Sequence, residues 1–180
     1  MTTVASQEIA GTASGPASTT VRPRAGALAD RLELGARALA TFAGRLTAAD
    51  WKTRLPGDGR TIGVVVHHVA SVYPIEIELA QTIAGGAPIT GVTMAEIDAM
   101  NARHAVENAE VTKAAALDLL RANSAAAAAA IRALTDEQLD SATTVSLYSD
   151  ALLTCQFVLE DHAVRHSCHH LARIRRALNR

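Results

Sequence analysis

The sequence predicts an all-α protein, a four-helix bundle, from three observations. The 180 residues are 49% hydrophobic but only 3% aromatic, and a chain rich in Ala and Leu favours helices packed on helices. Apolar residues recur at helical spacing over four long segments. The connections between these segments are modest in length, as between neighbouring helices of a bundle. A chain of this length is expected to form one domain with a substantial core.

The first helix is predicted over residues 25–45. Leu28, Leu32 and Leu39 follow a near-heptad spacing there and define one apolar stripe. Residues 1–24 are rich in Ser, Thr, Ala and Gly without a sustained period, so we expect a flexible N-terminal tail. The bundle domain is therefore expected to occupy residues 25–180.

Threonine residues mark the expected starts of most later elements, because a threonine hydroxyl can accept a hydrogen bond from the first turn of a helix. Two of them open short capped turns and three open long helical segments. In chain order these are Thr47, Thr61, Thr93, Thr112 and Thr135. The second helix should end at Gly85, and Pro74 is expected to kink or restart it. The stretch from Thr93 is expected to loosen near residues 108–112 and then continue.

The last helix is predicted over residues 151–178, after a loop at residues 140–150 in which Ser149 or Asp150 serves as the N-cap. Cys155 and Cys168 both lie in this helix. Thirteen residues of helix separate them by roughly 20 Å at about 1.5 Å per residue, so they cannot form a disulfide with each other. Both are expected to be buried apolar residues.

The formal net charge of −1 provides no excess of positive charge for a polyanion, so general nucleic-acid binding is not expected. We expect no stretch to be apolar for long enough to span a bilayer, and the N-terminus lacks the pattern of a secretory signal. Unpaired cysteines are consistent with a reducing compartment. We therefore expect a cytoplasmic protein without a membrane partner.

Histidines are concentrated in the last helix, where four of the seven in the protein lie within residues 162–170. His162, His166 and His170 recur every four residues, so their side chains stack along one stripe of a helix. Two imidazoles one turn apart can bind the same divalent metal ion. The pair His166 and His170 is the first choice, and His162 with His166 is the second.

A third ligand is needed, because catalytic zinc sites typically take three ligands from the protein. The second helix offers His67 and His68, whose side chains point about 100° apart. His68 lies close to the buried side, beside Val65 and Val69, and is the expected ligand. His67 and His169 are expected on helix flanks, and His104 at a solvated position.

At these positions the chain resembles the DinB/YfiT-like metalloproteins. The resemblance rests on RTIGVVVHHVA at residues 60–70, on HSCHHLARIR at residues 166–175, and on EIDAMNA at residues 96–102. It implies an up-down-down-up four-helix bundle in which His68, His166 and His170 bind Zn²⁺ or Ni²⁺ with an open coordination position. The chain departs from the family pattern at Ser71, where an acidic residue is usual, and at Arg173, where Gln is common.

Three further residues are candidates for the pocket or for hydrogen-bonding support of the ligands. His162 could line the site or donate to a ligand. Asn101 could orient a bound water or substrate, or form a hydrogen bond between helices. Arg173 could alter the pocket, although an arginine there also complements the negative end of the last helix. No catalytic residue can be assigned from the sequence.

The resemblance implies chemistry with a low-molecular-weight thiol such as mycothiol or bacillithiol. The first functional hypothesis is a metal-dependent thiol S-transferase or isomerase that acts on a small electrophile. A metal-activated water would make the same site a hydrolase. A zincin-type peptidase is not expected, because the sequence has no H-E-x-x-H pattern. The remaining alternative is a non-catalytic metal-binding bundle that serves interaction, such as a homodimer.

Overall fold

The computed structural model describes residues 24–180, so the expected tail at residues 1–24 lies outside the described part of the chain except for Arg24, which belongs to the first helix. Four long helical segments form the bundle: α1 (Arg24–Gly44), α3 (Ile62–Ala84), α5 (Lys113–Arg132), and a composite last segment of α7 (Cys155–Leu159), the π-helical turn η2 (Glu160–Val164) and α8 (Arg165–Ala177). Smaller elements connect them: α2 (Ala48–Lys52), α4 (Met94–Glu107), α6 (Asp136–Asp140), β1 (Ala142–Val145), η1 (Ser146–Tyr148) and β2 (Ala151–Thr154).

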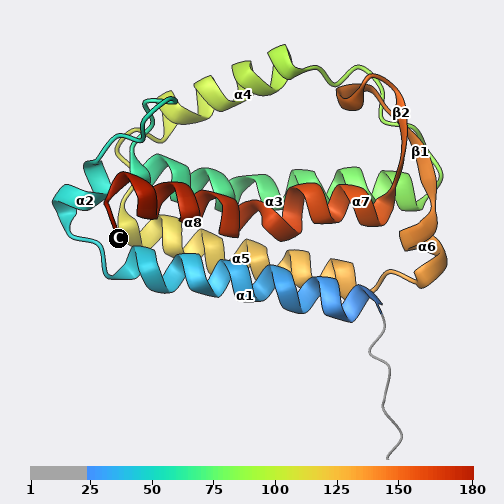
Figure 1. The fold of residues 1–180 in the computed structure, drawn as a ribbon, viewed down its shortest axis with the longest axis horizontal. Helices are drawn as coiled ribbons and strands as arrows, with labels where there is room; N and C mark the ends of the chain where they lie inside the picture. Colours follow the sequence, from blue (N-terminus) through green and yellow to red (C-terminus); the bar gives the residue numbers. More distant parts are fainter. Residues whose placement is uncertain (1–23) are drawn as a thin grey trace, which may run out of the picture.

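The bundle has the up-down-down-up order of helix directions (Figure 1). Helices α3 and α5 run in the same direction, and α1 and the last segment run opposite to them. Helix α4 makes this order possible, because it carries the chain back along the outside of the bundle between the end of α3 and the start of α5. The predicted all-α bundle is therefore confirmed.

The predicted threonine caps are all present. In each case the threonine hydroxyl accepts a hydrogen bond from the backbone N–H three residues later. Helix α1 begins one residue before its predicted start. Helix α3 continues through Pro74 without a restart, so that part of the expectation is wrong. Burial of its valines stabilises α3, since β-branched residues are weak helix formers.

The core lies between α1, α3, α5 and the last segment. Leu28, Leu32 and Leu39 of α1 are all buried, as their spacing predicted. In the alanine run of α5, Ala127 and Ala128 are buried. Their small side chains allow α5 to pack closely against both α1 and α3.

The last helix starts later than predicted, because residues 142–154 form a β-hairpin. Strand β1 pairs antiparallel with β2, and Thr143 lies opposite Leu153. Ser149 and Asp150 do not cap a helix; their φ angles of 55° and 57° place both in the left-handed region, in the turn of the hairpin. Thr154 is the N-cap of α7 instead. The β-branched run at residues 143–145 favours strand over helix.

Helix α4 is not part of the bundle, contrary to the expectation of one loosely continuous third helix. None of its residues is buried, and it lies apart from the other long helices over the face formed by α3 and the last segment (Figure 1). Residues 108–112 separate it from α5. A cavity lies between α4 and α3, lined by side chains of both helices.

The expectations about membrane-spanning segments and about the burial of the cysteines need correction. Helices α3 and α5 are each long and apolar enough to cross a membrane by length and composition alone, although 67% of the α3 window is buried within the protein, as in a core helix. Both cysteines are free, and Cys155 is buried, but Cys168 is exposed. Cys168 lies on α8 between the buried Ser167 and the exposed His169, with its Sγ beside Gly35 of α1.

Candidate metal centre

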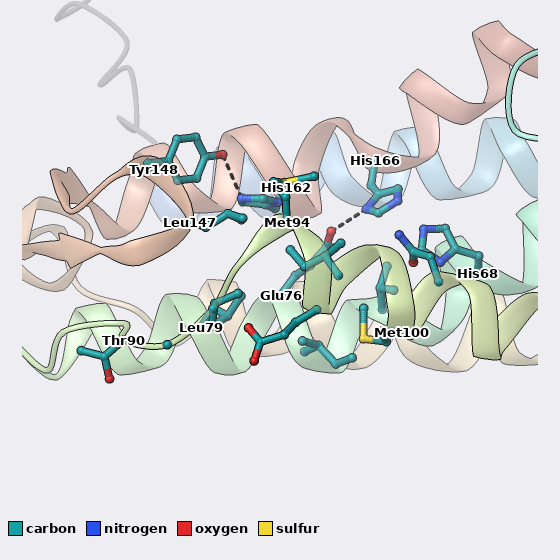
Figure 2. Close-up of a pocket in the computed structure, with 17 residues that line it drawn as sticks. His68, Glu76, Leu79, Thr90, Met94, Met100, Leu147, Tyr148, His162 and His166 are labelled. Atoms are coloured by element: carbon teal, nitrogen blue, oxygen red, sulfur yellow. Dashed lines mark hydrogen bonds and ion pairs between the residues drawn. The ribbon is translucent and has the colours of Figure 1, made fainter.

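The three predicted ligands come together between α3 and α8. One potential ligand atom from each of His68, His166 and His170 lies within 4.8 Å of the other two. The ring of His68 is 5.3 Å from that of His166 and 5.6 Å from that of His170, centroid to centroid. His68 and His166 face each other across the gap between the helices (Figure 2). Residues almost one hundred positions apart therefore form one cluster.

The π-helical turn η2 ends just before His166 and decides which histidines share this cluster. Such a turn inserts an extra residue per turn, and π turns often occur at functional sites. In a regular helix, His162 and His166 would lie one above the other on the same face, and the π turn changes this alignment. His162 does not belong to the cluster and instead contacts Tyr148, with Nε2 3.0 Å from the phenol oxygen (Figure 2). The second-ranked ligand pair, His162 with His166, is therefore not brought into a three-residue group.

Glu76 orients His166. Oε1 of Glu76 lies 2.5 Å from Nδ1 of His166, so the Nδ1–H group donates to the carboxylate and the Nε2 lone pair is left for a metal. A carboxylate on the far nitrogen of a ligating histidine is a recurrent support of metal sites. Glu76 lies on α3 eight residues after His68, on the same face of the helix. The sequence reasoning missed it, although an acidic residue in an apolar helix face was a usable signal.

Burial keeps two of the three rings neutral. Desolvation disfavours the imidazolium form and, with repulsion from His166, lowers the pKa of His68 to about 3. The same two causes, in the same order, lower the pKa of His170 to about 2. A neutral imidazole is the form that binds metal. Both rings are therefore available as ligands throughout the physiological pH range.

The residues fit a divalent ion that prefers nitrogen ligands. Nδ1 of His170 is buried without a hydrogen-bond partner among the described residues, and so is Oε2 of Glu76. Such orphaned buried atoms are costly unless a ligand or water satisfies them. Zn–N bonds are about 2.1 Å long, so two ligand atoms of one ion lie at most about 4.2 Å apart. Small rotations of the rings would close the present separation.

His67 and His104 form a second histidine pair beside the triad. Nδ1 of His67 lies 2.9 Å from Nε2 of His104, and the two rings stack. The ring of His104 also lies 5.6 Å from that of His68. His104 is therefore half-buried against α3 and not at a solvated position, which corrects the expectation. Burial lowers the pKa of both residues.

The other candidates divide between the pocket and the surface. Asn101 lines the cavity next to His68, and its Oδ1 is buried without a partner, so the expected hydrogen bond between helices is not formed by that atom. Arg173 does not line the cavity. Its Nη2 donates to Oδ2 of Asp58 at 2.7 Å, in a cluster that also contains Arg60. His169 is exposed, as expected for a flank.

A second polar group lies in the wall of the cavity. The Tyr148 hydroxyl donates to the Asp161 carboxylate and also contacts His162. Burial and the Asp161 carboxylate both raise the pKa of Tyr148, so its phenol stays protonated. Sequence reasoning missed Tyr148, because the hairpin that carries it was expected to be a loop.

Comparison with known proteins identifies the family. The model of the DinB superfamily matches residues 31–174. The chain belongs to the DinB superfamily. Its fold is also similar to that of YfiT from Bacillus subtilis, described as a probable metal-dependent hydrolase with an unusual four-helix bundle topology. The two chains are 20% identical, with a TM-score of 0.71 over 92% of this chain and 91% of YfiT. No curated protein matches this DinB-superfamily chain.

Proposed function

We propose that this DinB-superfamily protein is a metal-dependent enzyme that activates a small nucleophile beside His68, His166 and His170 and delivers it to an electrophile in the adjoining cavity. The observation that supports this most directly is that one nitrogen atom from each of the three imidazoles lies within 4.8 Å of the other two, beside a cavity of about 660 Å³ that His68 and His166 line. Ligand sites typically have volumes of 300–1,000 Å³. The triad, a cavity and a supporting carboxylate are thus in one place.

The protein groups have distinct roles in this proposal. His68, His166 and His170 would hold Zn²⁺ or Ni²⁺, and Glu76 would keep the Nε2 atom of His166 turned toward the ion. A divalent ion lowers the pKa of a thiol or water and so supplies a nucleophile near neutral pH. His162 lies in the wall of the same cavity with Tyr148 and can accept or donate a proton there.

Two nucleophiles are candidates. A low-molecular-weight thiol such as mycothiol or bacillithiol is the first, because the motifs around His68 and His166 resemble those of the DinB/YfiT-like family, some members of which are thiol-dependent. The enzyme would then be a thiol S-transferase or isomerase. Water is the second, and the description of YfiT as a probable metal-dependent hydrolase favours it. Each nucleophile gives a different product from the same electrophile.

The test is a turnover screen of the protein loaded with Zn²⁺ or Ni²⁺. Activated alkyl halides, epoxides and esters are supplied with mycothiol, bacillithiol, a simple thiol, or no thiol. A thioether product that requires added thiol supports the transferase, and an acid or alcohol formed without thiol supports the hydrolase. The His68→Ala variant should lack both activities. Metal bound at the triad with no turnover of any pair would favour a non-catalytic metal-binding bundle.

A further inference from the structure

The cavity beside the triad is much larger than a water nucleophile requires. Its volume of about 660 Å³ equals that of roughly twenty water molecules at about 30 Å³ each. It extends from His68 and His166 at one end to Thr90 and Tyr148 at the other (Figure 2). The second reactant is therefore expected to be an elongated molecule.

Most of the wall is apolar. Helix α3 contributes three aliphatic side chains, α4 contributes Met and Ile side chains at helical spacing, and the hairpin contributes one leucine. These residues are Val72, Ile75, Leu79, Met94, Ile97, Met100 and Leu147. Methionine side chains adapt to ligands of different shape. The body of the molecule that fits here is hydrocarbon.

The charges of the wall exclude an anionic tail. Within the described part of the chain, no Lys or Arg lines the cavity, whereas Glu76 and Glu96 do. A phosphate or carboxylate carried into this space would lose its hydration without gaining a cation. The tail is therefore expected to be uncharged.

The end of the cavity near the triad requires hydrogen-bond donors. Oε2 of Glu76 and Oδ1 of Asn101 are buried acceptors without partners among the described residues, and both side chains line the cavity. A head group with an N–H, O–H or S–H hydrogen would satisfy them. An amide, a hydroxyl or a thiol meets this requirement, and an ether or a ketone does not.

The exposed apolar side chains of helix α4 favour the same occupant. Met94, Ile97 and Met100 face the cavity from α4, yet no residue of α4 is buried. Met94 is 58% exposed. His104 of α4 contacts His67 of α3, and an apolar tail in the cavity would cover the remaining apolar side chains on this face of α4.

We propose that the substrate is an uncharged, elongated molecule with a hydrogen-bond-donating head at the triad and a straight hydrocarbon tail beneath α4. This proposal rests on the proposed metal-dependent function and names the substrate class of that site. Aliphatic hydroxamates are suitable probes, because the head binds metal and donates hydrogen bonds while the tail can be lengthened one methylene at a time.

The experiment measures binding of straight-chain hydroxamates, from two to ten carbons, to the Zn²⁺-loaded full chain by calorimetry. Burial of one methylene contributes about 0.8 kcal/mol, so affinity should rise about fourfold per added carbon until the cavity is filled. A ten-carbon hydroxamate with a terminal carboxylate should bind at least tenfold more weakly than the uncharged one. Affinity independent of chain length, or equal binding of the charged tail, would overturn the proposal.

Variants locate the tail. Ile97→Trp should fill the cavity from α4 and weaken binding of the ten-carbon probe at least tenfold, without loss of zinc. Ala99→Trp is the matched control, because Ala99 is exposed on the same helix and outside the cavity. Leu147→Trp fills the cavity from the hairpin. Weaker binding in both variants could then not result from a displacement of α4 alone. Unchanged long-chain binding in both cavity variants would contradict the proposal.

A separate arm distinguishes failure of the tail site from failure of the metal function. If the protein binds no divalent ion, the proposed function is wrong, and straight-chain alcohols are then titrated into the metal-free protein. The fourfold gain per carbon should persist for these alcohols if the apolar site exists. Zinc bound at the triad without any gain from chain length would reject the substrate class and leave the metal function standing.

Discussion

Nδ1 of His166 lies 2.5 Å from Oε1 of Glu76, and this contact joins α8 to α3 at the candidate metal centre. The Glu76 side chain is only 7% exposed, in a helix face that is otherwise largely apolar. The contact determines which nitrogen of His166 faces the other two imidazoles. It therefore links the packing of the bundle to the chemistry of the triad.

Replacement of Glu76 should weaken metal binding without removing a ligand. We expect Glu76→Ala to reduce the affinity for Zn²⁺ about 10–100-fold, because His166 loses the group that orients it and raises its basicity. Glu76→Gln should have a smaller effect, since an amide oxygen can still accept from Nδ1. Competition with a chelating dye measures these affinities. Glu78→Gln, at an exposed position on the same helix, is the control, and an effect equal to that of Glu76→Ala would contradict the role given to Glu76.

Removal of a ligand should have a larger effect than removal of its support. His68→Ala and His166→Ala are each expected to lose bound metal after dialysis, because two nitrogen ligands hold a divalent ion too weakly. His162→Ala should retain it, since His162 contacts Tyr148 and lies outside the three-residue cluster. Elemental analysis of the purified variants gives the metal content per chain. Loss of metal in His162→Ala with retention in His68→Ala would reverse the assignment.

The stability of the metal-free protein should fall as the pH is lowered. The folded-state pKa values of about 3 for His68 and about 2 for His170 lie below the unfolded value of about 6.5. Between these values the unfolded chain binds more protons, so the free energy of unfolding decreases with falling pH, by up to about 1.4 kcal/mol per pH unit for each ring. Urea denaturation between pH 6.5 and 4.5 measures this decrease in the free energy of unfolding. The range lies above the pH at which most carboxylates titrate.

The variant His170→Gln isolates one ring in the same experiment. It removes a titrating group while keeping a side chain of similar size. The slope of stability against pH should then decrease by about 1 kcal/mol per pH unit relative to the unsubstituted protein. Equal slopes for the two proteins would show that His170 is not held neutral by burial.

A buried hydrogen bond beside the triad should contribute to stability. The Tyr73 hydroxyl lies 2.7 Å from Oγ of Ser167, and both residues are fully buried between α3 and α8. Tyr73→Phe leaves the serine without a partner and should cost about 1–3 kcal/mol. The double variant Tyr73→Phe with Ser167→Ala removes both polar groups and should recover part of that loss. Denaturant titration of the three proteins measures it, and an additive further loss in the double variant would argue against the bond.

Much of the fold could be predicted from local signals. A threonine hydroxyl acts within one turn of its own helix, so Thr61, Thr93 and Thr112 mark helix starts without knowledge of the rest of the chain. The spacing of the leucines in α1 likewise predicts their burial without knowledge of the other helices. The hairpin was missed because residues 142–154 become strands through pairing with each other, and the tight turn at Ser149 and Asp150 resembles a helix cap in sequence.

The candidate site was predictable where the signal was local, either a histidine repeat within one helix or, for His68, a position beside buried valines. His166 and His170 lie one turn apart, which the sequence shows directly. The roles of Glu76 and Tyr148 depend on contacts with other elements, and the only local signal was the acidic Glu76 in an otherwise apolar helix face. His104 was misplaced for the same reason, since its partner His67 lies on another helix. Arg173 forms a salt bridge with Asp58, which lies in a distant loop, so the sequence of α8 alone could not predict this partner.

The most direct test of the central claim is anomalous diffraction from crystals of the protein grown with Zn²⁺, collected on both sides of the zinc absorption edge. We expect one strong anomalous peak between α3 and α8, with nitrogen atoms of His68, His166 and His170 about 2.1 Å from it. A peak bound instead by His67 and His104, or by His162, would contradict the account, as would a metal-soaked crystal with no peak at the triad.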